Sequence, residues 1–158
     1  MSRPAEITLR DYEDADGSAC AAVYDAAWHA GHPYAPRIIG LEQFVGDTAD
    51  EQVIVAEDGV GRVLGFVAVY EADAFVHHLY VDPDAKGCRV GTRLLHAAIS
   101  ALGRQASLKC QTRNTAALAF YRHLGWSDGD GGVSDGEPWI RMISPPLPHG
   151  VSGLSSEP

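Results

Sequence analysis

The sequence predicts an α/β fold in which helices flank a mixed, mostly antiparallel central sheet. The chain has 158 residues, which is the usual length of one domain. Its β-rich and amphipathic helical runs follow one another in the order β, α, α, β, β, β, α, β, α, β. Hydrophobic residues make up 46% of the chain and charged residues 21%, so a packed core is expected rather than a disordered chain.

The first half of the chain is predicted to supply a strand, two helices and a hairpin. Apolar and polar residues alternate from Ile7 to Arg10, and Asp14 or Asp16 can cap the helix that follows. The turn at 58–62, Asp-Gly-Val-Gly-Arg, separates two β-rich runs, which is typical of a hairpin. The elements of this half are expected at 7–10 (strand), up to 28 (helix), 38–45 (helix), 52–57 and 63–70 (strands).

The second half is predicted to alternate strands with helices. Pro83 ends the strand that begins at Ala74, because proline cannot donate to a ladder. Asn114 can cap a helix, and Gly103 and Gly125 stand where helices end in a left-handed residue. The elements of this half are expected at 74–82 (strand), 91–102 (helix), 107–112 (strand), 114–124 (helix) and 138–143 (strand).

One domain is expected over residues 1–144, followed by a flexible tail over 145–158. The tail is rich in Pro, Gly and Ser, which offer little surface to bury. No apolar run approaches the roughly 20 residues of a membrane helix, and the N-terminus lacks an apolar signal segment. We therefore expect a cytoplasmic protein with no membrane partner.

The charge balance argues against a nucleic-acid partner. Twelve Lys and Arg residues stand against 21 Asp and Glu residues, a net charge of -9, whereas nucleic acids and anionic membranes are bound by basic surfaces. A neutral or cationic small partner fits better. Cys20, Cys88 and Cys110 are widely spaced and form no C-x-x-C pair, which favours reduced thiols over a disulfide framework or a metal site.

The segment 79–95 joins a strand to a helix through a glycine-containing loop, an arrangement typical of an anion site. Backbone N–H groups of a first helical turn point outward, and Gly87 and Gly91 let an anion approach the main chain. An ordinary tight turn explains the same glycines. The spacing matches neither the phosphate loop of ATP sites nor the fingerprint of NAD sites. The side chains that can add donors or positive charge are Thr92, Lys86 and Arg89.

Two blocks of the sequence resemble the GCN5-related N-acetyltransferase (GNAT) family. The segment 86–91, Lys-Gly-Cys-Arg-Val-Gly, is similar to the family's acetyl-CoA signature Q/R-x-x-G-x-G/A, with Lys86 at the Q/R position and Gly91 at the last position. The segment 114–126 is similar to N-x-x-A-x-x-F-Y-x-x-x-G-F. Together with the element order over residues 6–143, these blocks identify the chain as a member of the family. Arg89 departs from it by replacing the central glycine, where a Cβ is costly if φ is positive.

The resemblance implies that acetyl-CoA is the acetyl donor, and it implies no metal. The loop N–H groups would bind the pyrophosphate, the main chain of Leu79 and Val81 would pair with the pantetheine arm, and Asn114 would hydrogen-bond that arm. Asn114 as a plain helix cap and Tyr121 as a plain core residue are the structural alternatives. The implied cofactor-binding residues are Leu79, Tyr80, Val81, Lys86, Gly87, Cys88, Arg89, Val90, Gly91, Thr92, Asn114, Ala117, Phe120 and Tyr121.

Acetyl transfer to an amine needs a base for the amine and an acid for the leaving thiolate. The resemblance implies Tyr121 as the acid, with direct transfer in a ternary complex. Many relatives carry a glutamate where this chain has Phe75, and His77 lies two residues on, so it is expected on the same face and is our first choice of base. His78 is expected on the opposite face. The alternatives for the base are Glu71, Asp73, His29 or a chain of water molecules.

The acceptor is expected to bind near Trp28, His29 and Tyr34, because family members build this pocket partly from the first helix and its loop. We expect an N-acetyltransferase acting on a primary amine of a small molecule or peptide, and the acidic net charge favours a cationic acceptor. A non-catalytic acyl-CoA-binding or regulatory module of the same fold is the alternative. A different acyl group, a hydroxyl acceptor and a homodimer are left open.

Overall fold

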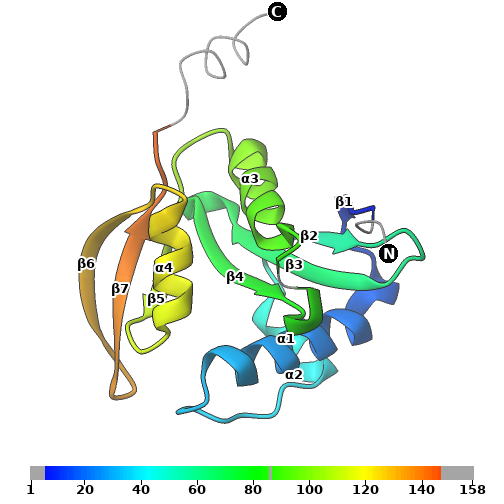
Figure 1. Cartoon of the computed structure of the whole chain (residues 1–158), viewed down its shortest axis with the longest axis horizontal. Coiled ribbons are helices and arrows are strands. Elements are labelled where there is room, and N and C mark those ends of the chain that lie inside the picture. Colours follow the sequence, from blue (N-terminus) through cyan, green and yellow to red (C-terminus); the bar gives the residue numbers. More distant parts are fainter. Residues whose placement is uncertain (1–5, 86, 147–158) are drawn as a thin grey trace, which may run out of the picture.

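The computed structural model describes residues 6–85 and 87–146. Its centre is a seven-stranded sheet in the order β1-β2-β3-β4-β5-β7-β6, in which β4 and β5 pair parallel and the other neighbours pair antiparallel (Figure 1). The predicted mixed, mostly antiparallel sheet is therefore confirmed. The strands are β1 (Thr8–Asp11), β2 (Gln52–Glu57), β3 (Val63–Tyr70), β4 (Phe75–Val81), β5 (Ser107–Gln111), β6 (Ser127–Ser134) and β7 (Glu137–Ile143).

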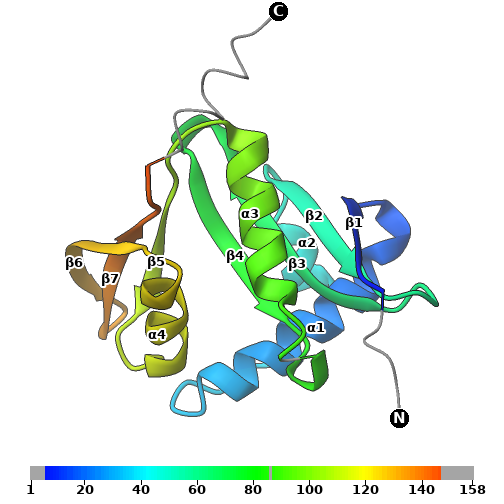
Figure 2. The same ribbon diagram turned by 45° about the horizontal axis from the view of Figure 1, so that its top comes forward.

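Helices cover both faces of the sheet, as Figures 1 and 2 show. Residues of α3 and α4 pack into one hydrophobic core, and residues of α1 and α2 pack into a second core on the opposite face. Successive side chains of a strand point to opposite faces of the sheet and so enter both cores. In β2, Val53 and Val55 face one core, and Ile54 and Ala56 face the other. The helices are α1 (Gly17–Gly31), α2 (Leu41–Asp47), α3 (Val90–Leu102) and α4 (Thr115–His123), with short 3₁₀ turns at Asp14–Asp16, Glu71–Asp73 and Pro83–Ala85.

The sheet opens between its two parallel strands. The register pairs β4 with β5 at Phe75 and Ser107, and the strands diverge beyond this pair in Figure 2. The rest of β4 therefore presents one main-chain edge that β5 does not pair. Such an edge can accept a further extended chain.

A β-bulge interrupts β4 at His77. Val69 pairs with Val76 and Ala68 pairs with His78, so His77 is the extra residue between them. The bulge overturns the predicted alternation, in which His77 and His78 point to opposite faces. Their ring centroids lie 4.0 Å apart, so the two imidazoles are neighbours.

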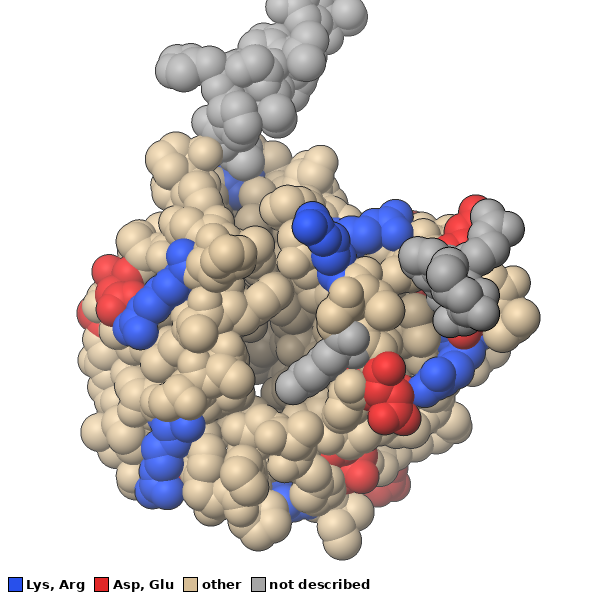
Figure 3. All heavy atoms as spheres, in the orientation of Figure 1, with Lys and Arg blue, Asp and Glu red and all other residues tan. Residues whose placement is uncertain are grey.

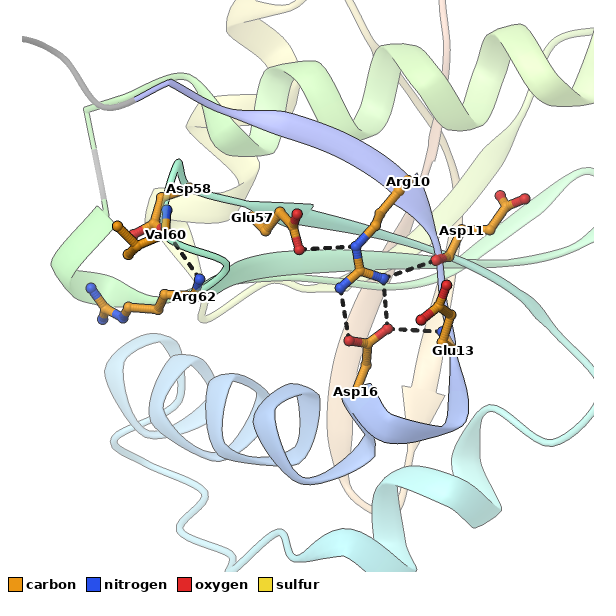
Figure 4. A network of polar contacts seen from close by, with 8 residues as sticks. All are labelled: Arg10, Asp11, Glu13, Asp16, Glu57, Asp58, Val60 and Arg62. Carbon is orange, nitrogen blue, oxygen red and sulfur yellow. Dashed lines mark hydrogen bonds and ion pairs between the residues drawn. The ribbon is translucent and has the colours of Figure 1, made fainter.

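Arg10 ties the start of α1 to the sheet (Figure 4). Its two terminal nitrogens donate to the carboxylate of Asp16 at 2.8 Å each, and its Nε donates to Glu57 at 2.9 Å. The Asp16 carboxylate also accepts from the backbone N–H of Glu13 at 2.8 Å. Asp16 is the N-cap residue of α1, as predicted, but its side chain makes no capping hydrogen bond to the helix, because its oxygens serve this network instead.

Two other predictions differ from the structure, and a third is not tested by it. The strand β6 was not predicted, since its sequence Ser-Asp-Gly-Asp-Gly-Gly-Val-Ser has one β-branched residue and no apolar alternation. The second helix begins at Leu41 rather than at Ile38, which is 90% exposed. The proposed boundary between a domain at 1–144 and a flexible tail stays a prediction, because most of the tail lies outside the described residues.

Candidate active site

A cleft of about 850 Å³ lies where β4 and β5 part, and it is the hollow near the middle of Figure 3. Its walls come from the end of α1, from β4, from the loop before α3, from β5 and from α4. Most of the cofactor-binding residues implied by the sequence line it, namely Leu79, Tyr80, Val81, Gly87, Arg89, Val90, Gly91, Thr92, Asn114, Ala117, Phe120 and Tyr121. Lys86 lies outside the described residues, and exposed Cys88 is not among the lining residues.

The loop before α3 places a helix N-terminus in the cleft wall. Gly87 has φ of 88°, and Arg89, which precedes the first residue of α3, has φ of 63°. Both are left-handed, so the position where the family motif has glycine does require positive φ in this chain. Arg89 keeps that conformation despite its Cβ. The N–H groups of the first turn, starting at Val90, are free of intrahelical partners and carry partial positive charge.

Cationic side chains line the cleft although the whole chain is acidic. Arg89, Lys109 and Arg113 line it, whereas none of its described lining residues is Asp or Glu. Arg113 is paired with Glu137 at 3.0 Å, so Arg89 and Lys109 supply most of the attraction for an anionic ligand.

Asn114 and Tyr121 occupy the α4 wall. The Oδ1 of Asn114 accepts from the Ala117 N–H at 3.2 Å, which confirms the predicted cap and leaves its Nδ2 amide available to donate. Tyr121 is 8% exposed, and burial raises the pKa of its phenol, with smaller contributions from Cys110 and Tyr80. The phenol therefore keeps its proton at neutral pH. Burial likewise raises the pKa of Cys110, which lines the cleft, to about 11.

His77 lines the cleft and is held from behind by Glu51. The Nδ1 of His77 contacts the Oε2 of Glu51, whose side chain is 7% exposed, while the His77 side chain is 48% exposed. Burial raises the pKa of Glu51, and His77 opposes this effect. No local sequence pattern marks Glu51, which precedes β2 by one residue and lies 26 positions from His77.

The neighbouring His78 is buried beneath Tyr24. Its Nε2 lies 3.9 Å from the Oε1 of Glu51, and its ring centroid lies 5.4 Å from that of Tyr24. Burial lowers the pKa of His78 to about 4. The alternative bases Glu71, Asp73 and His29 are not among the residues that line the cleft.

The loop after α1 closes the opposite end of the cleft, but with different residues from those predicted. Trp28 lines the cleft as expected, stacks on His32 with ring centroids 3.7 Å apart and donates from Nε1 to the Ala35 carbonyl at 2.7 Å. His29 and Tyr34 are not among the lining residues, whereas His32 is. Tyr34 contacts the wall indirectly, because its hydroxyl donates to Gln111 at 2.7 Å and Gln111 lines the cleft.

The helices offer no membrane segment. In the described ranges, none of them is both long enough and apolar enough to span a bilayer.

Comparison with known proteins finds acetyltransferases. Residues 49–128 match the model of the acetyltransferase (GNAT) domain. The chain is 30% identical over 127 residues to the N-alpha-acetyltransferase RimI of Mycobacterium tuberculosis, covering 76% of this chain and 78% of that protein. It is also 30% identical over 96 residues to an uncharacterized N-acetyltransferase of Methanocaldococcus jannaschii, covering 52% of this chain. The match spans only 41% of that archaeal protein's length.

A solved structure supports the same assignment at the level of the fold. The phosphinothricin acetyltransferase of Sinorhizobium meliloti, determined in complex with acetyl-CoA, superposes with a TM-score of 0.68 and 21% sequence identity, covering 89% of this chain and 88% of that one. The family-model match spans half of the chain and includes β4, the loop before α3, β5 and α4, which build the cleft together with the end of α1. The chain therefore belongs to the GCN5-related N-acetyltransferase family.

Proposed function

We propose that this protein transfers an acetyl group from acetyl-CoA to an amine of a small molecule or peptide, directly within a ternary complex. The observation that carries the proposal is the cleft, which combines a cationic lining, a helix N-terminus, a buried protonated phenol and a histidine backed by a carboxylate. An N-alpha-acetyltransferase and a phosphinothricin acetyltransferase solved with acetyl-CoA are among the proteins similar to this chain, and they support the same donor and an amine acceptor.

The donor would be held mainly by the main chain. Gly87 and the first turn of α3 offer N–H groups to a pyrophosphate, and the guanidinium of Arg89 adds charge at the same rim. The unpaired edge of β4 at Leu79 and Val81 suits an extended pantetheine arm, which would pair with it as an added strand. The free Nδ2 amide of Asn114 can donate to that arm from the facing wall.

Tyr121 would act as the general acid. When the C–N bond forms and the C–S bond breaks, the departing thiolate needs a proton, and the buried phenol of Tyr121 holds one at neutral pH. After donating, Tyr121 would recover its proton from solvent through the open cleft.

His77 would act as the general base, with Glu51 as a positioning residue. An Nδ1–H that donates to the Glu51 carboxylate fixes the tautomer in which Nε2 carries a lone pair. The Nε2 of His77 can then take the proton of the attacking amine, directly or through water, because His77 lines the cleft.

The acceptor would approach from the α1 end of the cleft, past Trp28 and His32. Tyr34 would act there through Gln111, and His29, whose Nδ1 lies 2.8 Å from the Asp25 carbonyl, would lie outside the acceptor's path. The acceptor that we propose is an amine, and cationic amines are included.

Thiol release from acetyl-CoA tests the proposal. The chain should release CoA thiol in the presence of at least one member of a panel that holds N-terminal peptides, phosphinothricin-like amino acids, polyamines and alcohols. His77→Gln should lower kcat/KM for the best amine about 10- to 100-fold. The matched control is His29→Gln, which removes an imidazole that does not line the cleft and should leave kcat/KM within a factor of about 2.

A non-catalytic acyl-CoA-binding module is the second candidate, and the left-handed Arg89 at a glycine position favours it. The two candidates differ in one result. Acetyl-CoA should raise the melting temperature of either one, since a ligand that binds the folded state stabilises it. Binding without turnover on the whole panel would favour the non-catalytic module, and the absence of a melting shift at saturating acetyl-CoA would contradict both.

A further inference from the structure

Three metal-ligand side chains meet at the β4 bulge. The ligand atoms of Glu51, His77 and His78 lie within 4.8 Å of one another. Consecutive residues of a regular strand point to opposite faces, so His77 and His78 could not share a ligand there. The bulge removes this restriction and brings their ring centroids to 4.0 Å.

Two of the three side chains have unsatisfied polar atoms. In the described part of the chain, the Oε1 of Glu51 and the Nε2 of His78 are buried and have no hydrogen-bond partner. The two side chains are 7% and 8% exposed, and the two atoms face each other at 3.9 Å. Buried polar atoms in folded proteins normally have a partner, so a pair of facing orphans indicates a bound species between them.

We propose that Glu51, His77 and His78 form a binding site for a divalent transition-metal ion of the Zn²⁺ class. Two imidazoles and one carboxylate are a donor set that suits Zn²⁺ and disfavours Mg²⁺ and Ca²⁺, which take oxygen ligands. With bonds of about 2.0–2.2 Å, a tetrahedral zinc ion separates its ligand atoms by about 3.3–3.5 Å. The 3.9 Å between Glu51 and His78 needs only small side-chain rotations to reach that spacing.

The site has one open position and two routes of access. Three protein ligands leave the fourth tetrahedral position to solvent or another ligand. His77 lines the large cleft, and Glu51 lines a second cavity of about 460 Å³ that is bordered by Tyr12 and Val53 on the α2 side. An ion can therefore reach the ligands from solvent.

His77 cannot bind a metal ion and act as the general base of acetyl transfer at the same time. This consequence rests on the proposed function. When the Nδ1 of His77 donates its lone pair to an ion, the proton of the neutral ring sits on Nε2. The ring then has no lone pair to take a proton from an amine. A bound ion would therefore inhibit acetyl transfer reversibly, and removal of the ion would restore it.

Direct binding of Zn²⁺ to the full chain tests the site without acetyl-CoA. After dialysis against a chelator, the chain should take up one equivalent of Zn²⁺ in competition with a chromogenic zinc indicator. Co²⁺ should give the intense visible absorption of a tetrahedral ion. His78→Gln should weaken Zn²⁺ binding about 100-fold or more, because it removes a direct ligand. His96→Gln, which removes an exposed imidazole on α3, is the matched control and should bind like the wild type.

His77→Gln is the second ligand variant, needed because His78 is buried and its replacement can destabilise the fold. Equal Zn²⁺ affinity in the wild type and in either folded ligand variant would overturn the site, as would less than one bound equivalent at micromolar ion.

Inhibition of acetyl transfer by Zn²⁺ is measured separately from Zn²⁺ binding. It should occur in the wild type, be reversed by the chelator and be lost in His78→Gln. If acetyl transfer is absent altogether, the binding measurements still decide the metal site, and only the proposed function fails.

Discussion

Replacing Gly65 with alanine should force β3 and β4 apart beside the cleft. Gly65 pairs with Val81, and a Cβ at this position would lie 2.8 Å from the Tyr80 carbonyl oxygen and 3.3 Å from the Val81 Cα. It would also lie 3.2 Å from the Cδ1 of Leu94, whose side chain is fully buried. Two of these neighbours are main-chain atoms, so no side-chain rotation relieves the contact.

The size of the effect follows from the overlap. Ordinary van der Waals contact begins near 3.4 Å, so the Tyr80 carbonyl must move by about 0.6 Å within a packed sheet. Overpacking of this kind costs about 1–3 kcal/mol of unfolding free energy. Each kcal/mol lowers the melting temperature of a domain of this size by about 2–4 °C, so we expect a decrease of roughly 2–12 °C.

Urea unfolding measures this cost, and Gly46→Ala is the matched control. Gly46 lies within α2, has no atom within 4 Å of the added Cβ, and should gain about 0.5–1 kcal/mol from the higher helix propensity of alanine. Gly65→Ala should also weaken acetyl-CoA binding, because the displaced Tyr80 main chain belongs to the wall of the cleft. A Gly65→Ala protein as stable as the wild type, with an unchanged m-value, would show that the sheet absorbs the methyl group and that the close approach has no structural role.

Tyr121→Phe should lower kcat by about 10²- to 10⁴-fold and leave the Kd for acetyl-CoA nearly unchanged, because the ring is kept and only the proton is lost. Arg10→Met should cost about 1–3 kcal/mol at pH 7 in urea unfolding, because it leaves the Asp16 carboxylate, whose side chain is 10% exposed, without its cation. Arg10 holds the pKa of Asp16 below its usual value, so the wild type should lose this advantage as the pH falls through that lowered pKa. Exposed Cys88 should react with a thiol reagent much faster than buried Cys110, whose pKa is raised to about 11, and acetyl-CoA should slow the reaction of Cys88.

Each of these predictions has a control and a contrary outcome. Tyr70→Phe removes an exposed phenol, and a loss of kcat equal to that of Tyr121→Phe would exclude a specific acid. Arg122→Met breaks an exposed pair with Asp128 and should cost clearly less than Arg10→Met in the same urea unfolding; equal costs for the two variants would mean that burial of Asp16 adds nothing. Cys88→Ser should abolish the fast thiol reaction, and its persistence would assign that reaction to another cysteine.

The fold could be predicted from the sequence where local signals and packing agree. The helix at 90–102 has its apolar residues on one face, and Gly103 has the left-handed conformation expected after its end. The strand β6 gave no local signal, because its polar and glycine residues extend only by pairing with β7. Tertiary pairing decided its conformation, and no property of the segment itself records that pairing.

The candidate site could be predicted in part for the same reason. The loop residues Gly87 and Gly91 and the cap Asn114 are identified by short-range spacing, and the structure brings them to one cleft. The pairing of His77 with Glu51 depends on a bulge set by the register of β3 with β4, and on a residue 26 positions away. The hydrophobic pattern of one strand predicts neither the bulge nor the distant partner, because it assumes that side chains alternate without interruption.

The parting of β4 and β5 makes the seam of the sheet depend on what occupies the cleft. Across that seam the Ser107 N–H donates to the Ala74 carbonyl at 3.1 Å and the register pairs Phe75 with Ser107, whereas β5 and β7 pair over five residues. The two sides are also joined through core side chains beneath α3 and α4 and through the hydrogen bond from Tyr34 to Gln111. Amide hydrogen exchange should therefore show low protection along the boundary between β4 and β5, with strands β1–β4 and β5–β7 opening as separate units. A ligand that pairs with the β4 edge would connect the two units across this boundary, as an additional strand would.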